Sequence, residues 1–211
     1  MLMRAFLLPQ FWLLLLCALT SRVVAATQLR IVDENGMSLQ HAVVELESSA
    51  AQPIANNIAI MDQIDKAFVP FVLAIQPGQE VSFPNSDDIR HHVYSFSQTK
   101  PFELKLYSGT PNQPLMFEKA GIVVLGCNIH DSMVGYIYVA EQPVLITDAQ
   151  GLVNLPDNID TVMVWHPYQT KDIDKKQTVQ IESKNSQISI TIEITTPVPR
   201  NTFGARFGQH E

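Results

Sequence analysis

The chain contains little that could cross a membrane. Its one strongly apolar run, residues 11–19, is far shorter than the roughly 20 residues that a transmembrane helix needs. The cationic Arg4 before this run and the small residues at 24–26 after it are typical of a secretory signal peptide. We therefore expect residues 1–26 to be a signal peptide that is cleaved near residue 25–26. The mature protein is then predicted to be periplasmic or secreted, with no membrane span after cleavage.

Cysteine is almost absent as well. The chain has 2 cysteines, and Cys17 lies within the predicted signal peptide. Cys127 would then be the single thiol of the mature protein, which excludes an internal disulfide. An unpaired thiol is a liability in an oxidising compartment, so burial, pairing with another chain or metal ligation must account for Cys127.

Basic residues are in the minority. Lysine and arginine together number 14 against 21 acidic residues, which gives a net charge of −7. Loss of residues 1–26 would remove two arginines and no acid, so the mature charge is about −9. Nucleic acids are bound by clustered lysine and arginine, so this balance argues against a nucleic-acid partner.

Long segments with helical periodicity are missing, and 13 prolines are spread along the chain. Short runs that alternate apolar and polar residues are separated instead by Asn, Asp, Gly and Pro, the pattern of β-strands joined by turns. We expect an all-β fold, built as a two-sheet sandwich or a barrel. The predicted strands are residues 28–32, 42–46, 71–75, 80–83, 92–96, 121–125, 135–139, 161–165, 178–182 and 188–194.

The side chains that carry chemistry gather between residues 55 and 140, and the flanks are plain strand and turn sequence. In the flanks, Ile-Val-Asp-Glu-Asn-Gly at 31–36 and Thr-Asp-Ala-Gln-Gly at 147–151 resemble pieces of the carboxypeptidase regulatory-like β-sandwich. This resemblance implies one discontinuous sandwich around the central segment. The expected domains are a signal peptide (1–26), the first part of the regulatory-like sandwich (27–50), a central domain (55–140), the second part of the sandwich (143–195) and a flexible tail (196–211).

Cys127, His130 and Met133 follow one another at intervals of three residues between two predicted strands. Thiolate, imidazole and thioether are soft donors, and one Cys with two His and a weak axial Met is the donor set of blue-copper sites. With 6 His and 7 Met in the chain, this spacing after a given Cys would arise by chance roughly once in a thousand. The loop is therefore predicted to bind a metal together with a second histidine from another strand.

The second histidine is expected from residues 91–92, where two histidines are adjacent. Adjacent residues of a strand point to opposite faces, so only one of them can reach the metal. Alternation does not choose between them, because the face of His92 is the more apolar and that of His91 the less. At this point the ligand is either His91 or His92.

The central segment, over roughly residues 55–140, resembles the cupredoxins, the family of plastocyanin, pseudoazurin and amicyanin. The matching sequences are Phe-Val-Pro at 68–70, Pro-Gly-Gln-Glu-Val-Ser-Phe at 77–83, Gly-Cys-Asn-Ile-His-Asp-Ser-Met-Val-Gly at 126–135, and Asn85 six residues before His91. The resemblance implies a Greek-key β-sandwich, selects His91 as the ligand, and gives Asn85 and His92 supporting positions around the ligands. The chain departs from the family pattern at His92, where many cupredoxins have Asn, and at Ile129, where Pro is frequent.

The resemblance further implies a type 1 site with one Cu(I)/Cu(II) ion held by His91, Cys127, His130 and Met133. A closed site without a nearby general acid or base suits one-electron transfer, so we expect an electron carrier and not an enzyme, with no catalytic residues. Its partners would be redox proteins such as a cytochrome or a dehydrogenase. Two alternatives remain, a copper-binding protein or chaperone and a zinc-binding β-sandwich module, although zinc seldom binds a thioether.

Other polar residues receive simpler interpretations. Asp87 and Asp88 are expected to form a solvated turn, and His166 to have a structural role. By the same resemblance, His130 with Ile129, Ser132 and residues 83–84 would form a docking patch for redox partners.

Overall fold

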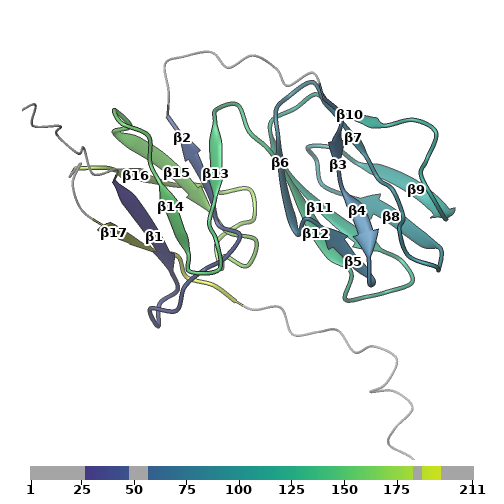
Figure 1. Cartoon of the computed structure of the whole chain (residues 1–211), viewed down its shortest axis with the longest axis horizontal. Coiled ribbons are helices and arrows are strands. Elements are labelled where there is room, and N and C mark those ends of the chain that lie inside the picture. The colour runs from purple at the N-terminus through teal and green to yellow at the C-terminus, as the bar shows by residue number, and fades with distance from the viewer. Residues whose placement is uncertain (1–26, 48–56, 183–186, 196–211) are drawn as a thin grey trace, which may run out of the picture.

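The computed structural model describes residues 27–47, 57–182 and 187–195 (Figure 1). Within these ranges every regular element is a β-strand, and the strands form several sheets, so the predicted all-β fold class is confirmed. No helix in these ranges is long and apolar enough to cross a membrane. The predicted signal peptide and the predicted tail lie outside the described residues.

The central strands form two sheets that face each other and a small hairpin. The larger sheet has the order β6 (Val72–Ile75), β12 (Val134–Val139), β11 (Gly121–Cys127), β8 (His91–Ser95) and β9 (Phe102–Tyr107). The smaller sheet has the order β10 (Leu115–Phe117), β7 (Gln79–Ser82) and β3 (Ala59–Ile60), and the hairpin pairs β4 (Asp62–Ile64) with β5 (Ala67–Val69).

Alternation along these strands builds the central core. Val81 of β7 and Val123, Leu125 and Ile137 of the larger sheet are fully buried and belong to one hydrophobic cluster, which also contains Cys127. Burying each such aliphatic side chain stabilises the fold by about 1.5–3 kcal/mol. The sheet pair therefore forms a rigid support that ends at Cys127, the last residue of β11.

The strands that precede the central segment in the sequence pair with strands that follow it. One sheet has the order β14 (Leu152–Asn154), β1 (Gln28–Val32) and β17 (Gln187–Thr191), and the other β13 (Val144–Ile146), β2 (Val43–Leu46), β15 (Thr161–Trp165) and β16 (Gln177–Gln180). Both β1 and β2 thus pair with strands that follow residue 143. A second hydrophobic cluster, with Leu29, Val44 and Val162 at its centre, fills the space between these sheets.

A third cluster joins the two lobes seen in Figure 1. Tyr136 and Tyr138 of β12 contact the ring of Trp165 of β15, with ring centroids 5.7 and 5.5 Å apart. β12 is buried at nearly every position because both of its faces are covered. Ile137 packs in the central core, and Tyr138 packs in the junction. The junction is therefore made by the larger central sheet and the sheet that contains β2 and β15.

A charged residue is buried in this junction. Glu45 of β2 is 1% exposed and accepts hydrogen bonds from Tyr138 Oη (2.7 Å) and Lys176 Nζ (2.5 Å), while the amide of Gln142 donates to its other oxygen. Lys176 also lies over the Tyr138 ring, 4.9 Å from its centroid. We call Glu45, Tyr138 and Lys176 the interface cluster. Burial, together with the neighbouring Glu45 carboxylate, raises the pKa of Tyr138 far above its usual value, so its hydroxyl stays a donor.

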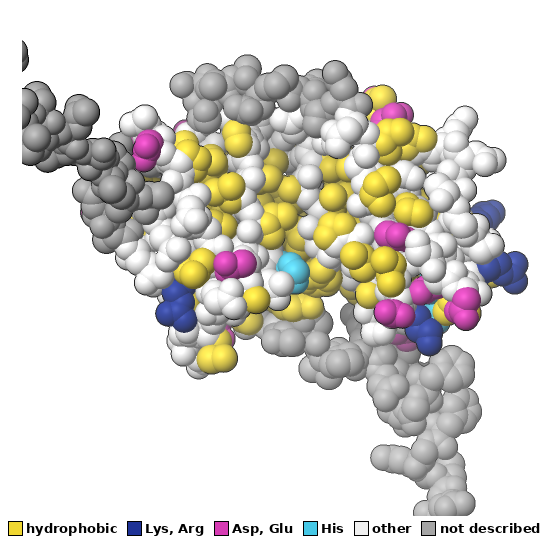
Figure 2. Space-filling model, in the orientation of Figure 1, with side chains coloured by type: hydrophobic (Ala, Val, Ile, Leu, Met, Phe, Trp, Pro, Cys, Tyr) yellow, Lys and Arg dark blue, Asp and Glu magenta, His cyan; other side chains and the backbone are white. Residues whose placement is uncertain are grey.

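On the face shown in Figure 2, hydrophobic side chains gather over the smaller central sheet and the β4–β5 hairpin. Ile60, Ile64, Val69 and Met116 are each more than a third exposed there. This face of the central strands therefore carries a group of exposed apolar side chains.

Candidate metal centre

The candidate site lies where β8 and β11 run side by side. Gly126 is opposite Tyr94 and Cys127 is opposite Val93 in this antiparallel pairing. A β-carbon at position 126 would lie 2.7 Å from Cζ of Tyr94, so the glycine lets that ring lie against the strand immediately before Cys127. The end of β11 is thereby fixed beside the start of β8, where the two histidines stand.

Three predicted donors converge at this point. The Cys127 sulfur lies 3.8 Å from Nδ1 of His91 and 3.7 Å from Nδ1 of His130. Ligand atoms of these three residues all lie within 4.8 Å of one another, and the two imidazole centroids are 5.0 Å apart. We call His91, Cys127 and His130 the donor cluster. Its three facing atoms are one sulfur and two ring nitrogens, which suits a metal with a preference for soft and borderline ligands.

The structure separates the two adjacent histidines. His91 is fully buried and faces Cys127, whereas the side chain of His92 lies on the other face of β8, with Nε2 3.0 Å from a carboxylate oxygen of Glu103. Nε2 of His92 is buried and makes no hydrogen bond, so its contact with Glu103 is one of proximity. His92 is therefore placed beside Tyr94, at a ring distance of 6.0 Å, and away from the donor cluster.

Met133, the predicted weak ligand, is buried at the end of the loop. It is 1% exposed and belongs to the same hydrophobic cluster as Cys127. Its amide donates to the carbonyl of His130 at 2.9 Å, which closes the loop into a turn. The loop thus turns a thioether inward three residues after it presents His130. Binding of copper by these four residues stays a prediction.

Asn85 supports the segment that leads to His91. It is 5% exposed, and its side-chain amide donates to the carbonyls of Ile89 (2.8 Å) and Tyr107 (3.0 Å). Its side-chain oxygen accepts from the amide of Asp87. These bonds fold residues 85–89 into a compact loop and fasten it to β9.

The expectation that Asp87 lies in a solvated turn is wrong, because only 11% of its side chain is exposed. Its carboxylate oxygen Oδ2 lies 2.6 Å from Nε2 of His91, the ring nitrogen that faces away from Cys127. Burial is the largest single influence and raises the pKa of Asp87, but the hydrogen bonds from Lys66, His91 and Asp65 and the charge of His91 together outweigh it, so the pKa is lowered. An acidic residue four positions before a candidate ligand was the available sequence signal, and it is weak because Asp is common in turns.

His130 is the more accessible of the two imidazoles. Desolvation lowers its pKa, the charges of His91 and Lys66 lower it further, and Asp87 opposes them. The neighbouring Ile129 is 50% exposed. The expected patch needs one correction, because Phe83 is 2% exposed and packs in the central core against Phe102 and Phe117, so it cannot contact a partner.

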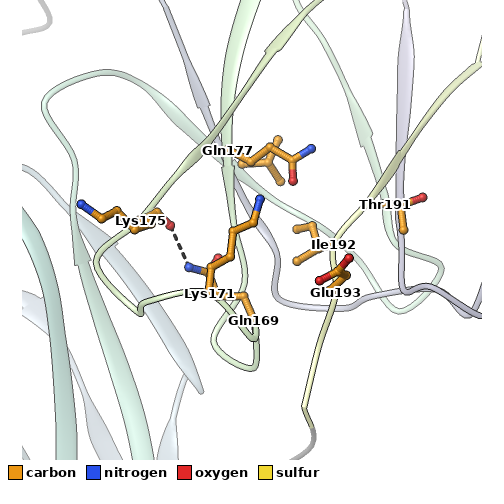
Figure 3. A pocket seen from close by; sticks show the side chains of 8 residues that line it. Gln169, Lys171, Lys175, Gln177, Thr191, Ile192 and Glu193 are labelled. Carbon is orange, nitrogen blue, oxygen red and sulfur yellow. Dashed lines mark hydrogen bonds between the residues drawn. The ribbon is translucent and has the colours of Figure 1, made fainter.

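The remaining candidates lie in the flanking lobe. His166 is 3% exposed, and its ring nitrogens are engaged by the carbonyl of Gln40 and the amide of Tyr168. Burial lowers its pKa to about 4, consistent with the structural role expected from the sequence. Figure 3 shows a pocket of about 250 Å³ in the same lobe that contains none of the predicted ligands. Its lining residues are Val164, Gln169, Lys171, Lys175, Gln177, Thr191, Ile192 and Glu193.

No protein-family model and no curated protein matches the chain. Among solved structures, a copper-containing nitrite reductase from Thermus scotoductus SA-01 is 24% identical over 47% of this chain, with a TM-score of 0.39. The match spans 26% of that protein, so this chain corresponds to about a quarter of its length.

Two smaller copper proteins are also similar. A purple cupredoxin from Nitrosopumilus maritimus is 22% identical over 38% of this chain and 96% of its own, with a TM-score of 0.34. A variant of amicyanin in its reduced Cu(I) form is 19% identical over 46% of this chain and 97% of its own, with a TM-score of 0.35.

Proposed function

We propose that this chain is a mononuclear type 1 copper protein that carries single electrons between redox partners and is not an enzyme. The observation that carries the proposal is the convergence of His91 Nδ1, Cys127 Sγ and His130 Nδ1 at the end of β11. A copper ion in this site would supply the one-electron chemistry by alternating between Cu(I) and Cu(II).

The spacing of the donors supports a metal at their centre. One ion can bind a sulfur and a nitrogen together only if the two atoms lie within about 4.4 Å of each other, the sum of the zinc bond lengths of about 2.3 Å to sulfur and about 2.1 Å to nitrogen. The sulfur-to-nitrogen distances of 3.8 and 3.7 Å are within this limit. Both histidines present the same ring nitrogen to the sulfur, so the three donor atoms already lie together.

Each residue of the site has a role that follows from its position. Cys127 would be the strong sulfur ligand and would link the ion to strand β11, and the fully buried His91 would be the fixed nitrogen ligand. His130, beside the half-exposed Ile129, would be the ligand nearest to a partner. Met133 would be the weak ligand that tunes the reduction potential. Because Met133 is buried, it would also keep water away from its side of the ion.

The same proposal covers the domains of the chain, its location and its partners. We infer a cupredoxin domain over residues 55–140, flanked by the two parts of a regulatory-like sandwich at 27–50 and 143–195, in a protein delivered to the periplasm by a signal peptide at 1–26. Pairing of β1 and β2 with strands beyond residue 143 supports the discontinuous sandwich. Redox partners would be proteins such as a cytochrome or a dehydrogenase.

The test is copper binding by the mature protein with Cu(II) sulfate, followed by metal analysis and a visible spectrum. We expect one copper per chain and a strong sulfur-to-copper charge-transfer band, both lost in Cys127→Ser and both kept in the control His41→Gln. Equal copper and colour in the wild type and Cys127→Ser would overturn the proposal. Binding of Cu(I) without a reversible Cu(II) state would favour a chaperone, and selective retention of zinc would favour the zinc module.

A further inference from the structure

The ring nitrogen of His91 that faces away from Cys127 also has a defined partner. Nε2 of His91 lies 2.6 Å from Oδ2 of Asp87, and the Asp87 side chain is 11% exposed while that of His91 is fully buried. An imidazole in this position has one nitrogen against a carboxylate and the other against a sulfur. A carboxylate without a proton can only accept, so it demands the ring proton on Nε2 and leaves the Nδ1 lone pair free to face Cys127.

Asp87 does not depend on His91 for its own orientation. The amide of Asp65 donates to its Oδ1 at 2.6 Å and the amide of Lys66 donates to its Oδ2 at 3.0 Å. Both residues have positive φ, 53° and 61°, so consecutive N–H groups of the β4–β5 turn point to the same anion. The carboxylate is therefore held by backbone groups before any metal binds.

The turn itself is fastened to the loop that carries Asp87. Ser86 donates through Oγ to Oδ2 of Asp62 at 2.8 Å and through its amide to the carbonyl of Gln63 at 3.0 Å. Gln63 is fully buried and donates to the carbonyl of Pro84 at 2.9 Å. Hydrogen bonds thus join the β4–β5 hairpin to residues 84–87. The turn amides bind the carboxylate of Asp87, and this carboxylate contacts the imidazole of His91.

From this arrangement we infer that Asp87 is a positioning residue for the copper site: it fixes His91 as an Nδ1 donor and strengthens that donor through its negative charge. This inference rests on the proposed copper function, because it assigns Asp87 a role toward the same ion. A hydrogen-bonded carboxylate makes the imidazole a stronger electron donor, which favours Cu(II) over Cu(I). Asp87 is therefore expected to hold the reduction potential down and the affinity for Cu(II) up.

The decisive variant is Asp87→Asn, which keeps the size of the side chain and removes its charge. Asp88→Asn is the matched control, because Asp88 is an exposed neighbour and its loss changes the net charge by the same amount. We expect Asp87→Asn to weaken Cu(II) binding roughly 10–100-fold in competition with a chromophoric chelator, to raise the reduction potential and to shift the charge-transfer band. Asp88→Asn should leave all three unchanged.

The outcomes separate this inference from the proposed function. If the wild type binds no copper or shows no charge-transfer band, the proposed function fails and the inference fails with it. If the wild type shows both, and Asp87→Asn matches Asp88→Asn in affinity, potential and spectrum, the inference alone is wrong.

A second measurement needs no variant of Asp87 and so does not depend on its folding. In the metal-free full chain with ¹⁵N-labelled histidine, the imidazole resonances of His91, assigned by their loss in His91→Gln, should show the proton on Nε2. A proton on Nδ1 in the neutral ring would overturn the inference, because Asp87 would then not select the donor atom.

Discussion

The interface cluster and the donor cluster are both largely buried, and they are satisfied in opposite ways. In the interface cluster, the carboxylate of Glu45 receives hydrogens from Tyr138, Lys176 and a backbone amide. In the donor cluster, the sulfur faces the two ring nitrogens at 3.8 and 3.7 Å, and which of these atoms donates depends on the histidine tautomers. Buried polar groups are normally hydrogen-bonded, so the first cluster is complete as it stands, whereas we propose that the second binds a cation.

A structural cluster and a binding site can be distinguished even when both are buried. A structural cluster loses stability when one member is removed, because the others are left uncompensated. A binding cluster loses its ligand but little stability, because its members give one another few hydrogen bonds. The following predictions test this contrast.

The largest effect is expected from Glu45→Ala. Loss of this carboxylate leaves the ammonium of Lys176 and the hydroxyl of Tyr138 without their acceptor inside the junction, and we expect the free energy of unfolding to fall by about 3–5 kcal/mol. Chemical denaturation of the metal-free protein measures the loss. Glu47→Ala, an exposed residue two positions along the chain, should change it by less than about 0.5 kcal/mol. Copper binding per folded chain should be the same in both variants, and a loss of copper binding in Glu45→Ala would contradict the separation of the clusters.

We expect His166 to make the free energy of unfolding depend on pH, with an effect of intermediate size. Its pKa is near 4 in the folded chain and about 6.5 in the unfolded chain, so the unfolded chain binds a proton first as the pH falls. The stability that the neutral ring contributes is fully present above pH 6.5 and is lost progressively down to about pH 4, by up to about 3 kcal/mol. His166→Gln should abolish this part of the pH dependence, measured as the difference between the two unfolding free energies at each pH. A constant difference from pH 7 to pH 4 would mean that folding does not shift the pKa of His166.

The smallest effect on stability is expected at the donor cluster. Because the described hydrogen bonds of the Cys127 sulfur are all made within this cluster, Cys127→Ser in the metal-free protein should change the free energy of unfolding by less than about 1 kcal/mol. Added Cu(II) should raise the melting temperature of the wild type, since a ligand that binds the folded state stabilises it, and should not raise that of the variant. A metal-free Cys127→Ser that is as unstable as Glu45→Ala would place Cys127 among the structural residues.

Much of the fold could be predicted from local pattern. Alternation placed strands at residues 28–32 and 161–165 with the bounds that the structure has, and other predicted strands differ by one to three residues at an end. The β4–β5 hairpin was missed because its turn residues, Asp65 and Lys66, adopt positive φ without the glycine or asparagine that usually marks such a turn. β9 was missed although Phe102 and Leu104 alternate with charged residues, because its outward face is exposed.

The donor cluster was more predictable than its surroundings. Two of its three members, Cys127 and His130, lie on one short loop or at its edge, and spacing alone indicated them together with Met133. The choice between His91 and His92 depends on which face of β8 is turned inward, and that is fixed by pairing with β11, over 30 residues away. The contacts of Asp87 with the Asp65–Lys66 turn, and of Glu45 with Lys176, depend likewise on distant strands meeting, which no local pattern records.

Strand β12 has a consequence for how the molecule responds to heat. Because Ile137 belongs to the central core and Tyr138 to the junction, neither lobe can release this strand without exposing apolar surface of the other. The two lobes should therefore melt as one cooperative unit in a single calorimetric transition. A copper ion bound at the end of the neighbouring strand β11 would then protect residues of the flanking lobe that it never touches, and damage to the junction would lower the temperature at which the metal is lost.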